Sequence, residues 1–204
     1  MAARGTFIEK VRIRISQIVM GTLLLSLLVV EPRLPGAHPL AANLLFALGC
    51  VFTGFGALGR IWCSLYIGGF KNRVVVEDGP YSLTRNPLYF FSCFGGLGLM
   101  LLTQTLTYPL VFLAFMSLYY PAVIRNEEAR LLATHGDLYR DYFSRVPRFF
   151  PRLAKPNEPK RYEVAPRSFR KNLTDAAWFI WAIPLLFLLG QARAALGLAW
   201  FAAW

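Results

Sequence analysis

The sequence predicts an all-α protein, a polytopic bundle of about five transmembrane helices with a helical region on its cytoplasmic side. Hydrophobic residues make up 56% of the 204-residue chain, above the roughly 45–50% of soluble domains. The mean hydropathy is +0.44. Residues 86–124 contain no charged side chain, which suits a bilayer interior, where charge is costly. We therefore expect a single integral-membrane domain over residues 1–204.

The first two predicted spans are apolar runs of suitable length, since a spanning helix needs about 20 largely apolar residues. Residues 15–30 form the first, and the sequence Glu-Pro-Arg-Leu-Pro ends it. Residues 40–68 form the second, with a break expected near Gly68 and Gly69. A secretory signal peptide is the competing reading of residues 1–30, but no clear small-x-small cleavage site follows the run directly.

The remaining predicted spans come from two later apolar regions. Residues 86–124 are too many for one helix, and the sequence TQTLTYP near their middle is a turn signal. We expect a tight hairpin of spans 87–103 and 107–124. The last span covers residues 175–192, and tryptophans near it suit the membrane interface.

Positive charge alternates along the chain and predicts its orientation. Four basic residues precede the first span, whereas Arg33 is the one lysine or arginine in the next loop. Residues 125–171 carry twelve Lys and Arg against six Asp and Glu. The positive-inside rule then places the N-terminus and this segment in the cytoplasm. The composition, rich in Ala and Arg, suggests a bacterial inner membrane.

Residues 125–172 are predicted to be a cytoplasmic helical segment followed by a basic linker. The fourth span should continue past the membrane as one helix to Gly136, and an amphipathic element should follow and end at Pro147 and Pro151. Residues 152–172 read as a surface linker. Contact with lipid headgroups and a solvated loop without a specific role are both open.

Charge and composition also bear on partners. The net charge is +11, but it lies between apolar runs, so membrane lipids are the expected partner and nucleic acid is not. The three cysteines have no CxxC spacing and read as buried free thiols. With two histidines in the chain, we expect no metal site. The sequence leaves the oligomeric state open.

Two polar clusters flank the charge-free hairpin. One is GPYSLTRNPLY, from Gly79 to Tyr89, and the other runs from Arg125 to Pro151 and includes Glu127 and Glu128. A helical hairpin returns its ends to one membrane face, so the clusters can meet. Each residue alone could be an ordinary interface residue, with arginine snorkelling and carboxylates solvated. Their combined order and spacing favour a site.

These clusters resemble the integral-membrane methyltransferases related to isoprenylcysteine carboxyl methyltransferase and phospholipid N-methyltransferase. That family's pattern is Gly-x-Tyr-x-x-x-Arg-His-Pro-x-Tyr, an apolar hairpin, Glu-Glu-x-x-Leu, Gly-x-x-Tyr-x-x-Tyr and Val-Pro-Arg. The matching residues lie within 73–151 and are Gly79, Tyr81, Arg85, Pro87, Tyr89, Glu127, Glu128, Leu131, Gly136, Tyr139, Tyr142 and Val146–Arg148.

The resemblance implies S-adenosylmethionine as the cofactor. We expect Arg85 and Glu128 to be the catalytic residues, with Glu128 or the Arg85 region orienting the acceptor. The resemblance implies cofactor binding by a larger set: Arg73, Val74, Val75, Val76, Tyr81, Asn86, Pro87, Leu88, Tyr89 and Glu127. The residue types suit this ligand, since carboxylates and aromatic faces attract sulfonium and ammonium groups. Gly96 and Gly98, expected to allow close helix packing, are a weaker alternative cofactor contact.

The chain departs from the family pattern at two positions. Asn86 stands where the family has histidine. Asparagine donates and accepts hydrogen bonds but carries no proton at neutral pH, which leaves a positioning role. Val123 stands where the isoprenylcysteine enzymes have a substrate-binding arginine, so a prenylcysteine carboxylate is not the expected acceptor.

The expected function is therefore methyl transfer from S-adenosylmethionine to a lipophilic or membrane-associated acceptor. A lipid amine, a carboxylate and a small thiol are all open. Two other classes are retained: a non-catalytic small transporter and a lipid-binding assembly protein. A transporter would need polar residues at mid-depth, and residues 86–124 offer no charged one.

Overall fold

The computed structural model describes residues 21–23, 25–70, 74–198 and 200–204. Most of them are helical, and two three-residue strands are present. The elements are β1 Val30–Pro32, α2 Leu34–Ala37, α3 Pro39–Ile67, α4 Pro80–Leu83, α5 Pro87–Leu101, α6 Thr107–His135, α7 Asp137–Arg145, α8 Pro166–Leu196 and β2 Phe201–Ala203. The predicted all-α class is confirmed.

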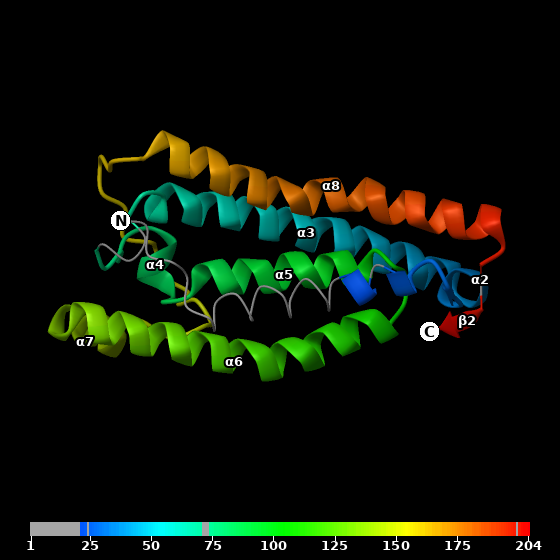
Figure 1. Cartoon of the computed structure of the whole chain (residues 1–204), viewed down its shortest axis with the longest axis horizontal. Coiled ribbons are helices and arrows are strands. Elements are labelled where there is room, and N and C mark those ends of the chain that lie inside the picture. The colour runs from blue at the N-terminus through cyan, green and yellow to red at the C-terminus, as the bar shows by residue number, and fades with distance from the viewer. Residues whose placement is uncertain (1–20, 24, 71–73, 199) are drawn as a thin grey trace.

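The long helices lie side by side in the order α8, α3, α5 and α6 (Figure 1). Small residues bring α3 and α5 together. A Cβ atom added at Gly56 would lie 2.4 Å from Cα of Gly95, and one added at Gly98 would lie 2.4 Å from the main-chain nitrogen of Thr53. Such close helix packing is characteristic of membrane bundles, and it is the role expected for Gly98.

Three of the described helices, α3, α6 and α8, are long and apolar enough to cross a membrane. Helix α5 has 15 residues, or about 22 Å, which is shorter than the roughly 30 Å hydrocarbon core. Of the predicted first span, 15–30, residues 15–20 and 24 lie outside the described residues. The chain is thus a helical membrane protein.

Several helix ends lie close to the predicted boundaries. Helix α3 ends at Ile67, before Gly68, and residues 102–106 separate α5 from α6. Helix α6 runs without interruption to His135 and stops at Gly136, whose φ is 56°. Non-glycine residues seldom adopt that backbone conformation.

The predicted linker 152–172 is partly wrong, because α8 begins at Pro166, before the predicted span 175–192. Proline is well placed at the first helical position. The basic residues that follow are good helix formers, so the span continues into its polar flank as one helix. Hydropathy identifies only the apolar part of this helix, so it did not predict the polar first turns.

The two short strands were not predicted. Val30, the last residue of the predicted first span, pairs in parallel register with Phe201, and Pro32 pairs with Ala203. The main-chain oxygen of Trp204 accepts from the nitrogens of Leu106 (2.7 Å) and Thr107 (2.8 Å). The C-terminal apolar tail is therefore tied to the end of the bundle opposite α4 and α7 (Figure 1).

Candidate active site

The turn before α4 depends on Gly79. Its φ of 59° suits glycine, and an added Cβ would lie 2.4 Å from the ring of Tyr66. The Gly79 nitrogen donates to the main-chain oxygen of Asn157 at 2.7 Å. Pro80 then occupies the first position of α4. This arrangement directs Tyr81 inward, where it is 6% exposed.

The two sequence clusters meet through a buried ion pair between Arg85 and Glu128. Arg85 Nε lies 3.0 Å from Glu128 Oε1, and the two side chains are 6% and 5% exposed. Arg148 contacts the other carboxylate oxygen, with Nη2 at 2.9 Å and Nε at 3.0 Å. Asn86 Nδ2 lies 3.4 Å from Glu128 Oε1. One buried carboxylate thus contacts three donor side chains, which come from both clusters.

Further contacts hold Arg85 and Asn86 in position. The guanidinium of Arg85 lies 3.7 Å from the ring centroid of Phe143, and its Nη1 donates to the Phe143 main-chain oxygen. Asn86 Nδ2 donates to the main-chain oxygen of Arg148 at 2.9 Å. Both side chains are therefore fixed before any ligand enters, which is the preorganisation that binding and catalysis require.

A small cavity that opens to solvent lies beside this ion pair. Its wall combines apolar and polar side chains from α3, α4, α5, α6, α7 and the residues before α4. The lining residues are Ile67, Val74–Val76, Tyr81, Arg85, Asn86, Pro87, Leu88, Tyr89, Glu127, Leu131, Tyr139 and Tyr142.

Tyr81 lines the cavity, and its hydroxyl is buried. That hydroxyl has no hydrogen-bond partner in the structure, although the Tyr81 main-chain oxygen accepts from the Tyr142 hydroxyl at 2.8 Å. Burial raises the pKa of Tyr81 well above its usual value, so the phenol stays neutral and can donate. An unsatisfied buried hydroxyl is costly, and a ligand in the cavity could satisfy it.

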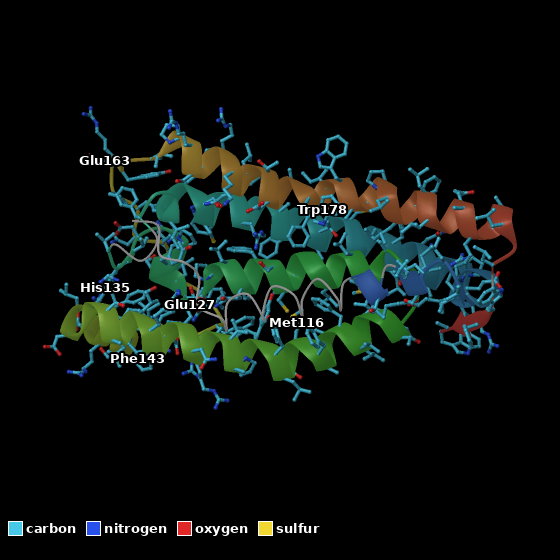
Figure 2. All side chains as sticks on the ribbon, in the orientation of Figure 1. Met116, Glu127, His135, Phe143, Glu163 and Trp178 are labelled. Atoms are coloured by element: carbon cyan, nitrogen blue, oxygen red, sulfur yellow. The ribbon has the colours of Figure 1, made fainter. Side chains whose placement is uncertain are left out.

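Glu127 is the carboxylate that faces the cavity. Its side chain is 18% exposed, and its Oε2 accepts from the Tyr89 hydroxyl at 2.5 Å. Glu127 lies where α6 faces α4 and α5, while Met116 lies farther along α6 (Figure 2). Successive residues of α6 thus have different surroundings: Glu127 lines the cavity and Glu128 is buried among arginines.

The structure brings nearly all of the predicted site residues together. All of the predicted cofactor-binding residues except Arg73 line the cavity, and so does Arg85. Arg73 lies outside the described residues. Glu128 is not among the described residues that line the cavity. The side chains of Arg85, Arg148 and Asn86 surround its carboxylate instead. Glu128 is therefore placed to position the side chains of Arg85 and Asn86.

Sequence reasoning assigned no role to several residues that build the site. Arg148 completes the ion-pair cluster, and Tyr139 and Tyr142 line the cavity. Burial raises the pKa of Tyr139 to about 12, which keeps its hydroxyl neutral. All three belong to the Gly-x-x-Tyr-x-x-Tyr and Val-Pro-Arg blocks. These two blocks were the sequence signal that could have identified the three residues, but the spacing of a motif does not show which side chains point inward.

The cavity suits a ligand that is cationic at one point and apolar at another. Glu127 offers a carboxylate, the tyrosines offer rings and hydroxyls, and Val75 and Leu131 offer apolar surface. S-adenosylmethionine has this character, with a sulfonium, an amino-acid group and an adenine ring. The unpartnered hydroxyl of Tyr81 is a further point of fit. Among the described residues, no group of three metal-ligating side chains is present.

Comparisons with known proteins agree with these features. The family model for phospholipid methyltransferases matches residues 39–143, just over half of the chain. A fission yeast protein-S-isoprenylcysteine O-methyltransferase (Schizosaccharomyces pombe) is 31% identical over 81 residues, 40% of this chain and 34% of that protein. No solved structure matches.

Two longer matches carry different names. The cobalt-zinc-cadmium resistance protein CzcN of Cupriavidus metallidurans is 38% identical over 178 residues, 87% of this chain and 81% of that protein. The nickel-cobalt-cadmium resistance protein NccN of Alcaligenes xylosoxydans xylosoxydans is 35% identical over 175 residues, 86% and 81% of the two chains.

Proposed function

Because this chain belongs to the phospholipid methyltransferase family, we propose that it transfers a methyl group from S-adenosylmethionine to a lipophilic or membrane-associated acceptor. One observation supports the proposal above the others. The family-like residues of both sequence clusters line one cavity, and among them are the carboxylate of Glu127 and Tyr81, whose buried hydroxyl has no partner. When bound, the cofactor supplies an electrophilic methyl group on a sulfonium sulfur.

Different residues of the cavity are proposed to bind different parts of the cofactor. Glu127 and Tyr89 would hold the cationic part of the cofactor, since a carboxylate with an aromatic neighbour favours positive charge. Tyr81 donates its free hydroxyl. The apolar wall, including Val75 and Leu131, would accommodate the adenine. These roles agree with the family resemblance and with the position of each side chain in the cavity.

Arg85 is the proposed catalytic residue that faces the acceptor, and Glu128 is its positioning partner. The ring of Phe143 and the carboxylate of Glu128 fix the guanidinium plane. Asn86 occupies the family's histidine position and is fixed by Arg148 and Glu128. Rate enhancement would come chiefly from orientation and from exclusion of water by the apolar wall.

The site lies at the end of the bundle where α4 and α7 are found (Figure 1). We place that end in the cytoplasm of a bacterium, with the protein in the inner membrane. The basic charge of residues 125–171 supports this orientation. The cofactor would then enter from water and the acceptor from the bilayer, so membrane lipids are the proposed partners.

The experiment is methyl transfer from labelled cofactor. Membranes containing the protein are incubated with methyl-labelled S-adenosylmethionine, and the label is followed into organic-extractable and aqueous small molecules by mass spectrometry. We expect a labelled product that the Glu127→Gln variant does not form. Absence of any product above empty membranes would favour a non-catalytic transporter or lipid-binding assembly protein.

The names of the two relatives with the longer matches suggest a biological role for the proposed methyl transfer. CzcN and NccN are named as metal resistance proteins. We propose that the methyl transfer serves resistance to divalent transition metals by altering a membrane component, not by binding the metal. A strain lacking the gene should regain cobalt or cadmium tolerance from the wild-type chain but not from Glu127→Gln. If the wild-type chain and Glu127→Gln restored tolerance equally, metal resistance would not depend on methyl transfer.

A further inference from the structure

A second cavity lies near β1 and the end of α8, at the end of the bundle opposite α4 and α7 (Figure 1). It encloses about 310 Å³, far more than the roughly 30 Å³ that one water molecule takes up in the liquid. Much of its wall is apolar and includes Leu27, Phe46, Ile183, Leu186 and Phe187. None of its described lining residues lines the candidate active site, so a ligand here would be separate from the cofactor.

A polar hollow adjoins this cavity. The cavity and the hollow share Pro32, Gln104 and Arg193 in their walls. The hollow adds Glu31 and Arg33, which belong to the loop that carries β1 and α2. An apolar chamber and a polar one therefore meet at three residues, an arrangement that suits a ligand with an apolar part and a charged part.

Two arginines give the hollow its charge. Arg193 lies in the last turn of α8, and its half-buried side chain donates through Nη1 to the main-chain oxygen of Val30 at 2.7 Å. The guanidinium of Arg33 lies 5.8 Å from the ring centroid of Trp204. Neither arginine forms an ion pair with a carboxylate of the described residues. Because a guanidinium has five N–H donors, both cations keep donors for an anion.

Gln104 has an unusual backbone at the same junction. Its φ is 57°, and among the described residues no other non-glycine residue has a positive φ. Such a conformation is uncommon outside glycine and is often found at ligand sites. Gln104 lines both the cavity and the hollow, where its amide can donate to a bound oxygen. Two guanidinium groups and an amide are suitable donors for a phosphate.

We infer that this end of the protein binds a phospholipid that is not the methyl acceptor, with its phosphate between Arg33 and Arg193 and one acyl chain in the apolar cavity. Charge favours an anionic head group, because the two arginines outnumber Glu31, the one carboxylate among the described residues of the hollow. Exposure favours a lipid over a soluble phosphate. Phe46 and Phe187, which line the cavity, are 39% and 60% exposed on helices long enough to cross the bilayer.

The inference goes beyond methyl transfer. In the proposed orientation, this end of the bundle lies on the side of the membrane away from the cytoplasm. The bound phospholipid would then come from the outer leaflet of the inner membrane, whereas the cofactor enters from the cytoplasm.

The test compares dioleoylphosphatidylglycerol with two of its parts: dioleoylglycerol, which lacks the phosphate, and glycerol phosphate, which lacks the chains. Delipidated full-length protein in a neutral detergent is incubated with each, and native mass spectrometry counts the molecules retained per chain. We expect the phospholipid to bind about tenfold tighter or more than either part, as one charge-assisted contact combined with a buried chain allows. Arg193→Gln should retain one phospholipid fewer per chain, and Arg193→Lys should recover part of the loss.

Arg140→Gln is the matched control, because it removes an equal charge from α7, where the side chain is 70% exposed. A phospholipid bound as acceptor at the other end of the bundle stays in both variants, so their difference reports this site alone. The inference is overturned if Arg193→Gln retains as much phospholipid as Arg140→Gln. It is also overturned if wild-type protein binds either part as tightly as the whole phospholipid.

Arg33→Gln is the second variant and decides the matter if Arg193→Gln does not fold. Arg33 is exposed, and its side-chain contact in the described structure is with the ring of Trp204, so folding should tolerate the change. We expect phospholipid binding to weaken about threefold or more. Unchanged binding in Arg33→Gln would overturn the inference.

Binding of S-adenosylmethionine is measured on the same samples. Arg193→Gln should bind the cofactor as the wild type does, because Arg193 is not among the described residues of the active-site cavity. Wild-type protein that retains the phospholipid through Arg193 but binds no cofactor would overturn the proposed function and leave this inference standing. Normal cofactor binding together with unchanged phospholipid retention in Arg193→Gln would overturn this inference alone.

Discussion

Arg85 and Glu128, which are 43 residues apart in the sequence, form a buried ion pair with Nε 3.0 Å from Oε1. The pair joins the turn before α5 to the far end of α6. Arg148 adds a second cation to the same carboxylate. The resulting cluster fixes the wall of the candidate cofactor cavity, and it leads to the first prediction.

Replacing Glu128 with glutamine should destabilise the protein. The change keeps the side-chain size but leaves Arg85 buried without its counter-ion, and loss of one partner of a buried pair costs about 3–5 kcal/mol. Thermal unfolding in detergent, followed by tryptophan fluorescence, measures the effect. Glu163→Gln, at an exposed position (Figure 2), is the control. Equal unfolding temperatures for the two variants would contradict the structural role of Glu128.

Arg85→Ala should abolish methyl transfer, and Arg85→Lys should recover little of it. An ammonium group carries the charge but cannot copy the planar fork that contacts both Glu128 and Phe143. Initial rates with labelled cofactor give the measurement, at matched amounts of folded protein. Arg140→Lys is the control for a surface change of the same kind. Near-normal turnover in Arg85→Ala would remove this residue from the chemistry.

Glu127→Gln should weaken binding of S-adenosylmethionine by about 1.5–3 kcal/mol, the range of a hydrogen bond to a charged group. The variant should still insert and purify, because Glu127 lies at the cavity and not within the Arg85–Glu128 cluster. Equilibrium dialysis with labelled cofactor reports the affinity. Glu163→Gln again serves as the matched change, and an affinity equal to that of wild type would exclude Glu127 from the site.

Tyr81→Phe and Tyr142→Phe should separate binding from stability. The Tyr81 hydroxyl has no partner in the protein, so its removal should lower cofactor affinity without lowering stability. The Tyr142 hydroxyl donates to the Tyr81 main chain at 2.8 Å, so its removal should cost about 1 kcal/mol of stability. Thermal-shift assays with and without cofactor measure both. Identical behaviour of the two variants would argue against a free donor at Tyr81.

A cysteine probe at residue 155 should be protected from external labelling of intact cells, and one at residue 36 should be labelled. Both positions are exposed. Helix α2, which contains residue 36, lies at the end of the bundle opposite the segment between α7 and α8, which contains residue 155 (Figure 1). The positive-inside rule places the end with residue 155 in the cytoplasm. A background without Cys50, Cys63 and Cys93 is required. The reverse labelling pattern would invert the proposed orientation.

Sequence patterns predicted the long helices and most of their ends, because hydropathy and glycine or proline signals are local. The stop at Gly136 and the turn after α5 are examples. Patterns failed where structure depends on distant contacts. The pairing of Val30 with Phe201 has no local signal, and the start of α8 at Pro166 lies in polar sequence.

The candidate site shows the same division. Motif spacing predicted that Arg85 and the Glu127–Glu128 pair could meet, because a hairpin returns its ends to one side. Spacing could not say that Glu127 faces the cavity while its neighbour is buried among arginines, since that depends on how α6 is rotated against α5. It also gave no reason to single out Arg148, whose importance follows from its contact with Glu128.

The most direct test of the central claim is calorimetric titration of S-adenosylmethionine into the detergent-purified wild-type chain. The claim is that the cavity beside the Arg85–Glu128 pair binds this cofactor. We predict saturable binding with one cofactor per chain, and a loss of affinity when Glu127 is changed to glutamine. The claim would be contradicted if correctly folded protein gave no saturable heat of binding, or if the wild type and Glu127→Gln bound the cofactor equally well.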